Sequence, residues 1–267
     1  MVYNRFAMDL TTWFKEIPTG IIGTPLSKER IDTLEQILSK RYGRDTTIDS
    51  VSQLKSKKNI VFSLTISSTG TKIHTVVAKM FIAGQFTNEL DILKTSWTQD
   101  LAVPQVLEAR DGVILMEFIP GETFVDRINY TFEPHLIDRL AEWYYNYHKV
   151  HGKIKGDSRL RNFILNEDKI YGVDFEESYE DHWMIDIAGV CASLLDTDPI
   201  FDLRKQRLSW RFLEKYLSLI NLPRDETIDA DFIATIADIL KQTSEWRDDQ
   251  RILELSETIR TEGLPFD

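Results

Sequence analysis

The spacing of apolar residues changes twice along the chain, near residues 46 and 120. Before the first change, apolar residues recur every three or four positions, the spacing of one face of an α-helix. Ser27 and Gly43 flank this stretch and are residue types that begin and end helices. The apolar face consists of Ile31, Leu34, Ile37, Leu38 and Tyr42. We expect residues 1–45 to form a helical extension packed on the rest of the chain.

Residues 46–119 have the pattern of a small antiparallel sheet. Stretches rich in β-branched and aromatic residues are separated by short polar turns, and one helical stretch interrupts them. An Asp-Gly pair at 111–112 is typical of a tight hairpin turn. We therefore predict a lobe of five strands and one helix. The first three strands are expected at 46–54, 59–67 and 72–82, the helix at 87–97, and the last two strands on either side of the Asp-Gly pair.

Beyond Pro120-Gly121 the pattern becomes mainly helical. Residues 134–151 start with proline, which is favoured in the first helical turn, and carry an apolar stripe. The stripe contains Leu136, Leu140, Trp143 or Tyr144, and Tyr147. Further helices are expected at 184–196, 203–220, 228–243 and 246–260. The sequence thus predicts an α+β fold with a sheet lobe at 46–119 and a mainly helical lobe at 120–267.

Composition excludes several classes of protein. The chain has 267 residues, of which 42% are apolar, so it can bury a large core. A net charge of -11 argues against broad binding of nucleic acid or anionic membranes. The single cysteine, Cys191, lies in an apolar run and is interpreted as a core residue. No signal peptide and no apolar stretch of about 20 residues is visible, so we expect a cytoplasmic protein without a membrane partner.

The residues most relevant to chemistry lie in the stretch "IKGDSRLRNFILNEDKIYGVDFEE", 154–177. Two short apolar strands joined by a turn would bring Asp174 back towards Asn162. Their hard oxygen ligands suit Mg²⁺. Asp157 would then lie close enough to accept a hydroxyl proton and orient the oxygen for in-line attack. Taken alone, all three residues could also be ordinary turn formers.

The order of these residues resembles the protein-kinase-like superfamily. Asp157 with Asn162 five positions on, followed by Asp174-Phe175, is similar to the catalytic loop and the metal-binding Asp-Phe-Gly element. Lys79 in "VVAK" and Glu89 in the next helix look like the phosphate-binding lysine and its ion-pair partner. Each has an ordinary alternative, a strand-edge lysine and a solvated carboxylate. The resemblance implies a bilobal fold and an enzyme that uses ATP and Mg²⁺.

The same resemblance places further residues at the nucleotide. Val77 and the backbone of Glu117, Phe118 and Ile119 would contact adenine, and Lys58 would supply charge near the phosphates. The loop 53–59 contains no glycine, however, which puts backbone cradling of phosphates in doubt. Its lysines are equally well explained as an exposed basic turn.

Within the superfamily, the chain is most similar to aminoglycoside and choline phosphotransferases, and also resembles lipopolysaccharide kinases and small RIO-type kinases. Eleven residues separate Asp174 from Asp186. Asp186 resembles the aspartate that begins the next helix in this branch of the superfamily. This segment is too short for a regulated activation loop. The chain departs from the family at Lys155, where histidine is usual, and at Glu176 in place of glycine. Arg159 stands where other members carry lysine or histidine, and could steady the γ-phosphate.

Three functions remain open from the sequence. The first is phosphate transfer to a hydroxyl of a small molecule, and the second is transfer to a protein serine or threonine, with RNA the weaker variant. The third is a nucleotide-binding scaffold without turnover. His148 and His151 lack a third ligand for a transition-metal site. Carboxylates that could receive a cationic acceptor are Glu133, Glu176, Glu177, Glu180 and Asp181, although a solvated acidic surface explains them as well.

Overall fold

The computed structural model describes most of the chain as two compact units. The described residues are 10, 19, 24–43, 45–56, 58–67 and 74–265. The first unit contains the described residues up to Lys94 together with Pro104–Ile119. The second contains Thr95–Val103 and the described residues from Pro120 onward. The predicted turn after the second strand, and the first two residues of the predicted third strand, lie outside the described residues.

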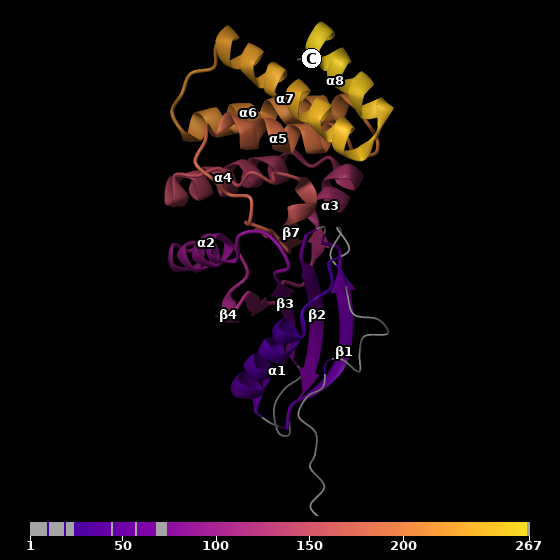
Figure 1. Ribbon diagram of the computed structural model, residues 1–267. Helices are drawn as coiled ribbons and strands as arrows, with labels where there is room; N and C mark the ends of the chain where they lie inside the picture. Colours follow the sequence, from indigo (N-terminus) through magenta and orange to yellow (C-terminus); the bar gives the residue numbers. More distant parts are fainter. Residues whose placement is uncertain are drawn as a thin grey trace, which may run out of the picture. The chain divides into compact units, whose positions relative to one another are not determined.

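The first unit is built on a five-stranded antiparallel sheet with strand order β1-β2-β3-β5-β4 (Figure 1). Residues rich in β-branched side chains form the strands, and the turn at 111–112 joins the last two, as predicted. The elements are α1 (Lys28–Tyr42), β1 (Thr47–Leu54), β2 (Ile60–Ser67), β3 (His74–Met80), α2 (Phe86–Thr98), β4 (Val106–Arg110) and β5 (Val113–Glu117). The last residues of α2 belong to the second unit.

Helix α1 covers one face of this sheet. Leu34 and Leu38 of α1 are fully buried in one core with alternate residues of β2 and β3, including Leu64 and Ala78. The Ser27 side chain accepts a hydrogen bond from the backbone N–H of Arg30, which caps the helix as predicted. Because strand side chains alternate between faces, Val77 and Lys79 point to the face opposite α1.

The second unit is mainly helical and contains one small sheet, of order β6-β7-β8. The predicted hairpin is present, with its second strand ending at Gly172, two residues before Asp174. Three short elements were not predicted: β6 (Glu122–Thr123), α3 (Phe124–Thr131) and the 3₁₀ helix η2 (Leu160–Asn162). The others are α4 (Pro134–His151), β7 (Phe163–Asn166), β8 (Lys169–Gly172), α5 (Met184–Leu195), α6 (Leu203–Leu219), α7 (Glu226–Arg247) and α8 (Gln250–Glu262). The predicted α+β architecture, with a five-stranded antiparallel sheet followed by a mainly helical part, is confirmed.

The predicted break between the last two helices was wrong by about four residues. Ser244, expected in the gap, is helical and buried, and its Oγ donates to the carbonyl of Lys241 at 2.6 Å. The chain turns instead at Asp248, which has a left-handed φ of 51° that aspartate tolerates. Asp249 then caps α8 through the backbone N–H of Arg251. The break is therefore set by two consecutive aspartates.

Aromatic side chains form the core beneath the hairpin. Trp143 of α4 lies edge-on to Phe163 at 5.1 Å and stacks on Tyr147 at 5.3 Å between ring centroids. Gly172 of β8 lies directly against the Trp143 ring, where a Cβ would come within 2.2 Å. Cys191 of α5 is fully buried, which confirms it as a core residue. Among the described helices, none is both long and apolar enough to cross a membrane.

Candidate active site

Lys79 and Glu89 form a buried ion pair in the first unit. Lys79 lies near the end of β3, and its Nζ is 2.6 Å from Glu89 Oε2 of α2. The two residues are 4% and 2% exposed. The Lys79 ammonium also lies 5.0 Å from the centre of the Phe81 ring. A strand-edge lysine or a solvated helix carboxylate would be exposed, so the structure excludes both ordinary alternatives.

The residues predicted to contact adenine lie on β3 and at the end of β5. Val77 pairs with Met116 across the two strands and is half-buried. The Glu117 N–H already donates to the Gln105 carbonyl at 2.9 Å. Any hydrogen bond from a backbone N–H here to a nucleotide base would therefore come from Phe118 or Ile119.

The loop between β1 and β2 contains the predicted Lys58, together with Lys55. Lys57 lies outside the described residues. Asn59 ends this loop and is 2% exposed. Its Oδ1 accepts hydrogen bonds from the backbone N–H groups of Ile82 at 2.9 Å and Ala83 at 3.2 Å. Asn59 thus fixes the turn that follows β3, the strand that carries Lys79.

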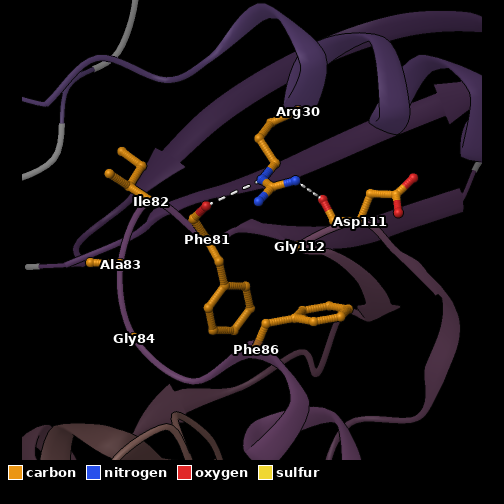
Figure 2. Close-up of a pocket in the computed structure, with 8 residues that line it drawn as sticks. All are labelled: Arg30, Phe81, Ile82, Ala83, Gly84, Phe86, Asp111 and Gly112. Atoms are coloured by element: carbon orange, nitrogen blue, oxygen red, sulfur yellow. Dashed lines mark hydrogen bonds between the residues drawn. The ribbon is translucent and has the colours of Figure 1, made fainter.

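A pocket of about 400 Å³ in the first unit adjoins this turn (Figure 2). Arg30 extends into it from α1, and its guanidinium donates to the carbonyls of Phe81 and Asp111. The other lining residues are Ile82, Ala83, Gly84, Phe86 and Gly112. The pocket contains none of the residues predicted to bind the nucleotide. Arg30 instead links α1 to the ends of the neighbouring strands.

Asp157 in the second unit is paired with Arg159. Arg159 Nε donates to Asp157 Oδ1 at 2.6 Å, and Nη2 donates to Oδ2, so the guanidinium binds the carboxylate through both nitrogens. The Asp157 side chain is 10% exposed and the Arg159 side chain is 27% exposed. The sequence analysis assigned Arg159 to the γ-phosphate and did not predict this ion pair.

The electrostatic surroundings keep Asp157 ionised. Burial by itself would raise the pKa of this carboxyl. The hydrogen bonds from Arg159 and the positive charges of Lys155 and Arg159 outweigh burial, so the pKa lies well below its usual range. At neutral pH Asp157 is therefore a hydrogen-bond acceptor with spare lone pairs.

Lys155 has a structural role that the sequence left open. It is fully buried, and its Nζ donates to the carbonyl of Asp157 at 2.8 Å and to the carbonyl of Asp174 at 2.9 Å. The ammonium also lies 5.2 Å from the centre of the Phe175 ring. One cation therefore connects the backbone of the loop that carries Asp157 to the backbone that carries Asp174.

Asp186 at the start of α5 holds the other side of this loop. Its carboxylate is fully buried and accepts from the backbone N–H groups of Lys155 at 2.5 Å and Gly156 at 3.0 Å. It also accepts from Ser158 Oγ at 2.7 Å and pairs with His148 Nε2 at 3.0 Å. A single aspartate thus determines the backbone path into Asp157.

Asn162 and Asp174 lie at the same end of the β7–β8 hairpin. The Val173 N–H donates to the Asn162 carbonyl at 2.9 Å, which places Asp174 next in the chain, with a left-handed φ of 64°. Asn162 Nδ2 donates to the Asp157 carbonyl at 3.3 Å. The other end of the amide, Oδ1, is the side-chain atom that can bind a metal ion. An amide oxygen and a carboxylate are donors that Mg²⁺ accepts.

The two histidines considered for a transition metal have other roles. His148 contacts Asp186 and the hydroxyl of Tyr216, and His151 pairs with Ser96 Oγ at 2.8 Å. Burial lowers the pKa of His151 to about 4, with a further contribution from the charge of Lys153. Both side chains are thus part of the packing around α4.

The second unit therefore brings together four of the predicted residues: Asp157, Arg159, Asn162 and Asp174. Lys79 and Glu89 form their pair in the first unit. Sequence reasoning missed what Lys155 does and most of what Asp186 does. The sequence carries no local signal for the role of Lys155, because it stands in the polar stretch "HGKIKGDSR", where a solvated lysine is the ordinary expectation.

Solved structures with the same fold include small-molecule kinases. An amicoumacin kinase in complex with AMP-PNP, Ca²⁺ and Ami matches at 13% identity and a TM-score of 0.62, covering 90% of this chain and 96% of that one. Choline kinase LicA from Streptococcus pneumoniae matches at 17% identity and a TM-score of 0.53, and the match covers 89% of this chain and 99% of that one. APH(2″)-IIa in complex with gentamicin matches at 13% identity and a TM-score of 0.56, and the match covers 91% of this chain and 99% of that one.

These similarities establish the fold. The chain has the protein-kinase-like fold found in aminoglycoside and choline phosphotransferases, which confirms the resemblance at that level. No protein-family model matches the sequence, and a sequence search against curated proteins finds no match.

Proposed function

We propose that this chain is an ATP- and Mg²⁺-dependent phosphotransferase that phosphorylates a hydroxyl group of a small molecule. The observation that carries the proposal is the connected group in the second unit, where Lys155 joins the backbones of Asp157 and Asp174, and Asn162 donates to the first of them. Solved structures of the same fold, whose names describe kinases of small molecules, support the choice of acceptor.

Each residue has a role in the proposed reaction. Lys79, held by Glu89, binds the α- and β-phosphates of ATP, and the hinge N–H groups of Phe118 and Ile119 face adenine. Asn162 and Asp174 would hold Mg²⁺, which when bound neutralises charge on the phosphates. Asp157 accepts a hydrogen bond from the acceptor hydroxyl and orients its oxygen towards the γ-phosphorus.

In the proposed transfer, one phosphorus–oxygen bond replaces another. A bond forms between the acceptor oxygen and the γ-phosphorus while the bond from that phosphorus to the β–γ bridging oxygen breaks. The electron pair leaves with ADP. The hydroxyl proton moves to Asp157 as the transfer completes and then to solvent. The low pKa of Asp157 makes it a weak base, so its main contribution is to orient the hydroxyl before transfer.

The test measures ATP binding and ATP consumption separately. The wild type is incubated with Mg·ATP and a panel of hydroxyl compounds, beside Asp157→Asn and Arg260→Gln. Arg260 pairs with Asp238 on the exposed surface of α7 and α8, so its variant is the control. We expect Asp157→Asn to bind Mg·ATP but to lose about 10²-fold or more of acceptor-dependent consumption. If the wild type does not bind Mg·ATP, the proposal is wrong, and if it binds but never transfers phosphate, a scaffold is favoured.

A further inference from the structure

Arg161 is a cation near Asp157 that the proposed mechanism does not use. It lies on η2, between Leu160 and the metal-site residue Asn162, and it is exposed. Within the part of the chain that the structure describes, the Arg161 side chain makes no hydrogen bond or ion pair. Arg159, two residues earlier, is already engaged by the Asp157 carboxylate.

A second arginine comes to the same region from the other end of the sequence. Helices α5 and α7 pack together, and η2 also contacts α5. The Leu160 N–H donates to Ser193 Oγ at 3.1 Å, so η2 lies at the last turn of α5. Arg247, the last residue of α7, pairs at 2.8 Å with Asp196, which caps the same end of α5. Arg161 and Arg247 therefore both lie at the C-terminal end of α5.

The electrostatics agree with this placement. Arg161 is exposed, but neighbouring atoms remove part of the water around its guanidinium, which lowers its pKa, and the positive charges of Arg159 and Arg247 lower it further. The negative charges of Asp157 and Asp174 act in the opposite direction and are smaller influences than burial and Arg159. Since Arg159 and Arg247 each have a carboxylate partner, Arg161 remains available to bind an added anion.

We infer that Arg161, with Arg247 beside it, selects an anionic hydroxyl compound as the phosphate acceptor. This inference rests on the proposed function, because it takes Asp157 as the residue that orients the acceptor. A guanidinium can bind a carboxylate or phosphate group of the acceptor through two nitrogens. The arrangement disfavours the cationic acceptor for which the sequence offered Glu133, Glu176, Glu177, Glu180 and Asp181, since a cation next to the unpaired guanidinium of Arg161 would be repelled.

The first experiment compares acceptors that differ in charge. Wild-type enzyme with Mg·ATP is offered glycerate, glycerol 3-phosphate and ribose 5-phosphate, their uncharged counterparts glycerol and ribose, and the cations choline and gentamicin. ATP binding is measured in parallel with a fluorescent nucleotide. We expect ATP consumption to rise with at least one anionic compound. Stimulation by the cations alone, or by no compound while ATP still binds, overturns the inference, whereas loss of ATP binding overturns the proposed function instead.

The second experiment assigns the selection to Arg161. With the best anionic acceptor, Arg161→Gln should raise KM for the acceptor about tenfold or more and change KM for ATP less than twofold. Arg161→Lys should recover part of the loss, because the charge remains without the two-nitrogen geometry. Arg260→Gln should match the wild type. An equal rise in both KM values would assign Arg161 to the nucleotide and overturn the inference.

Discussion

The carboxylate of Asp157 is bound by the guanidinium of Arg159, and in the proposed reaction it must also accept a hydrogen bond from a hydroxyl. A carboxylate has about four lone-pair positions, and Arg159 uses three of them: its Nε and backbone N–H donate to Oδ1, and its Nη2 donates to Oδ2. Oδ2 can therefore accept from Arg159 and from an acceptor hydroxyl at once. The pair has a further effect, because it keeps the carboxylate ionised in spite of burial. Arg159 therefore fixes both the orientation and the charge of Asp157.

Removing the guanidinium should raise the pKa of Asp157. In Arg159→Gln the hydrogen bonds and charge of the guanidinium are lost while burial and the charge of Lys155 remain, so we expect the pKa of Asp157 to rise from its low value towards the ordinary value of about 3.9. Carbon-13 NMR of labelled aspartate carboxyls measures this, with Asp157→Asn identifying the signal. Arg204→Gln is the control, since Arg204 holds the pKa of Asp202 at about 2 through a hydrogen bond elsewhere on the surface.

The direction of the pKa shift of Asp157 also predicts how the free energy of unfolding depends on pH. The folded pKa of Asp157 lies below the unfolded one, so the pair stabilises the fold above about pH 4 and this contribution disappears as pH falls through the folded pKa. Arg159→Gln should therefore have a lower free energy of unfolding than the wild type at pH 7, and this free energy should fall less than that of the wild type as the pH is lowered. An unchanged titration of Asp157 in this variant would contradict the assigned cause.

Helix α4 and the β7–β8 hairpin show how packing positions the chemistry. The hairpin places Asn162 and Asp174 together, and Trp143 of α4 supports it from below. Gly172 allows the close approach, since a Cβ at this position would come within 2.2 Å of Trp143 Cζ2. The two residues proposed to hold the metal therefore depend on a glycine and a ring that have no role in the proposed reaction.

Gly172→Ala should separate the hairpin from α4. The added methyl has no space beside a rigid ring, so we expect a loss of about 1–3 kcal/mol in the free energy of unfolding, measured with urea. Gly152→Ala is the matched control. Its Cβ would meet nothing within 4 Å, and only its φ of 60° costs stability, about 1 kcal/mol. Equal losses in the two variants would show that the contact with Trp143 is unimportant.

The sequence predicted the long elements that have a clear period or turn, and missed three short ones, β6, α3 and η2. Helix α4 and the hairpin were found because apolar spacing and a polar turn define them. The elements β6 and η2 span two and three residues, too few for any period to show. The pairing of Arg247 with Asp196 joins residues 51 positions apart, and sequence spacing carries no information about such a contact.

The proposed reaction assigns different tasks to the two units. The first provides Lys79 and Glu89 and the hinge, and the second provides Asp157, Asn162 and Asp174. The division of the chain into an extension at 1–45 and lobes at 46–119 and 120–267 remains a proposal. Residues 95–103 group with the second unit, although they precede the last two strands of the first. Such a division could not be predicted from periodicity, because it depends on which core each segment packs against.

In the proposed reaction, nucleotide binding should depend on Lys79, on Asp174 and on the metal. At a Mg·ATP concentration near 100 times Kd, we expect the melting temperature of the wild type to rise by about 5–10 °C. EDTA should remove most of this increase. Lys79→Met and Asp174→Ala should each reduce it, and Asp174→Ala should also become insensitive to EDTA. A full increase in Asp174→Ala, reversed by EDTA, would show that another residue holds the metal.

Lys155 sets a limit on how far the two backbone segments that carry Asp157 and Asp174 can move apart. Because one nitrogen bonds both carbonyls, the backbones of Asp157 and Asp174 can be no farther apart at those atoms than two hydrogen bonds laid end to end. A change that moved one aspartate would have to move the other or break a buried bond to a cation. Substrate exchange should therefore leave the spacing of these two residues constant, and any opening needed for turnover must occur elsewhere in the protein.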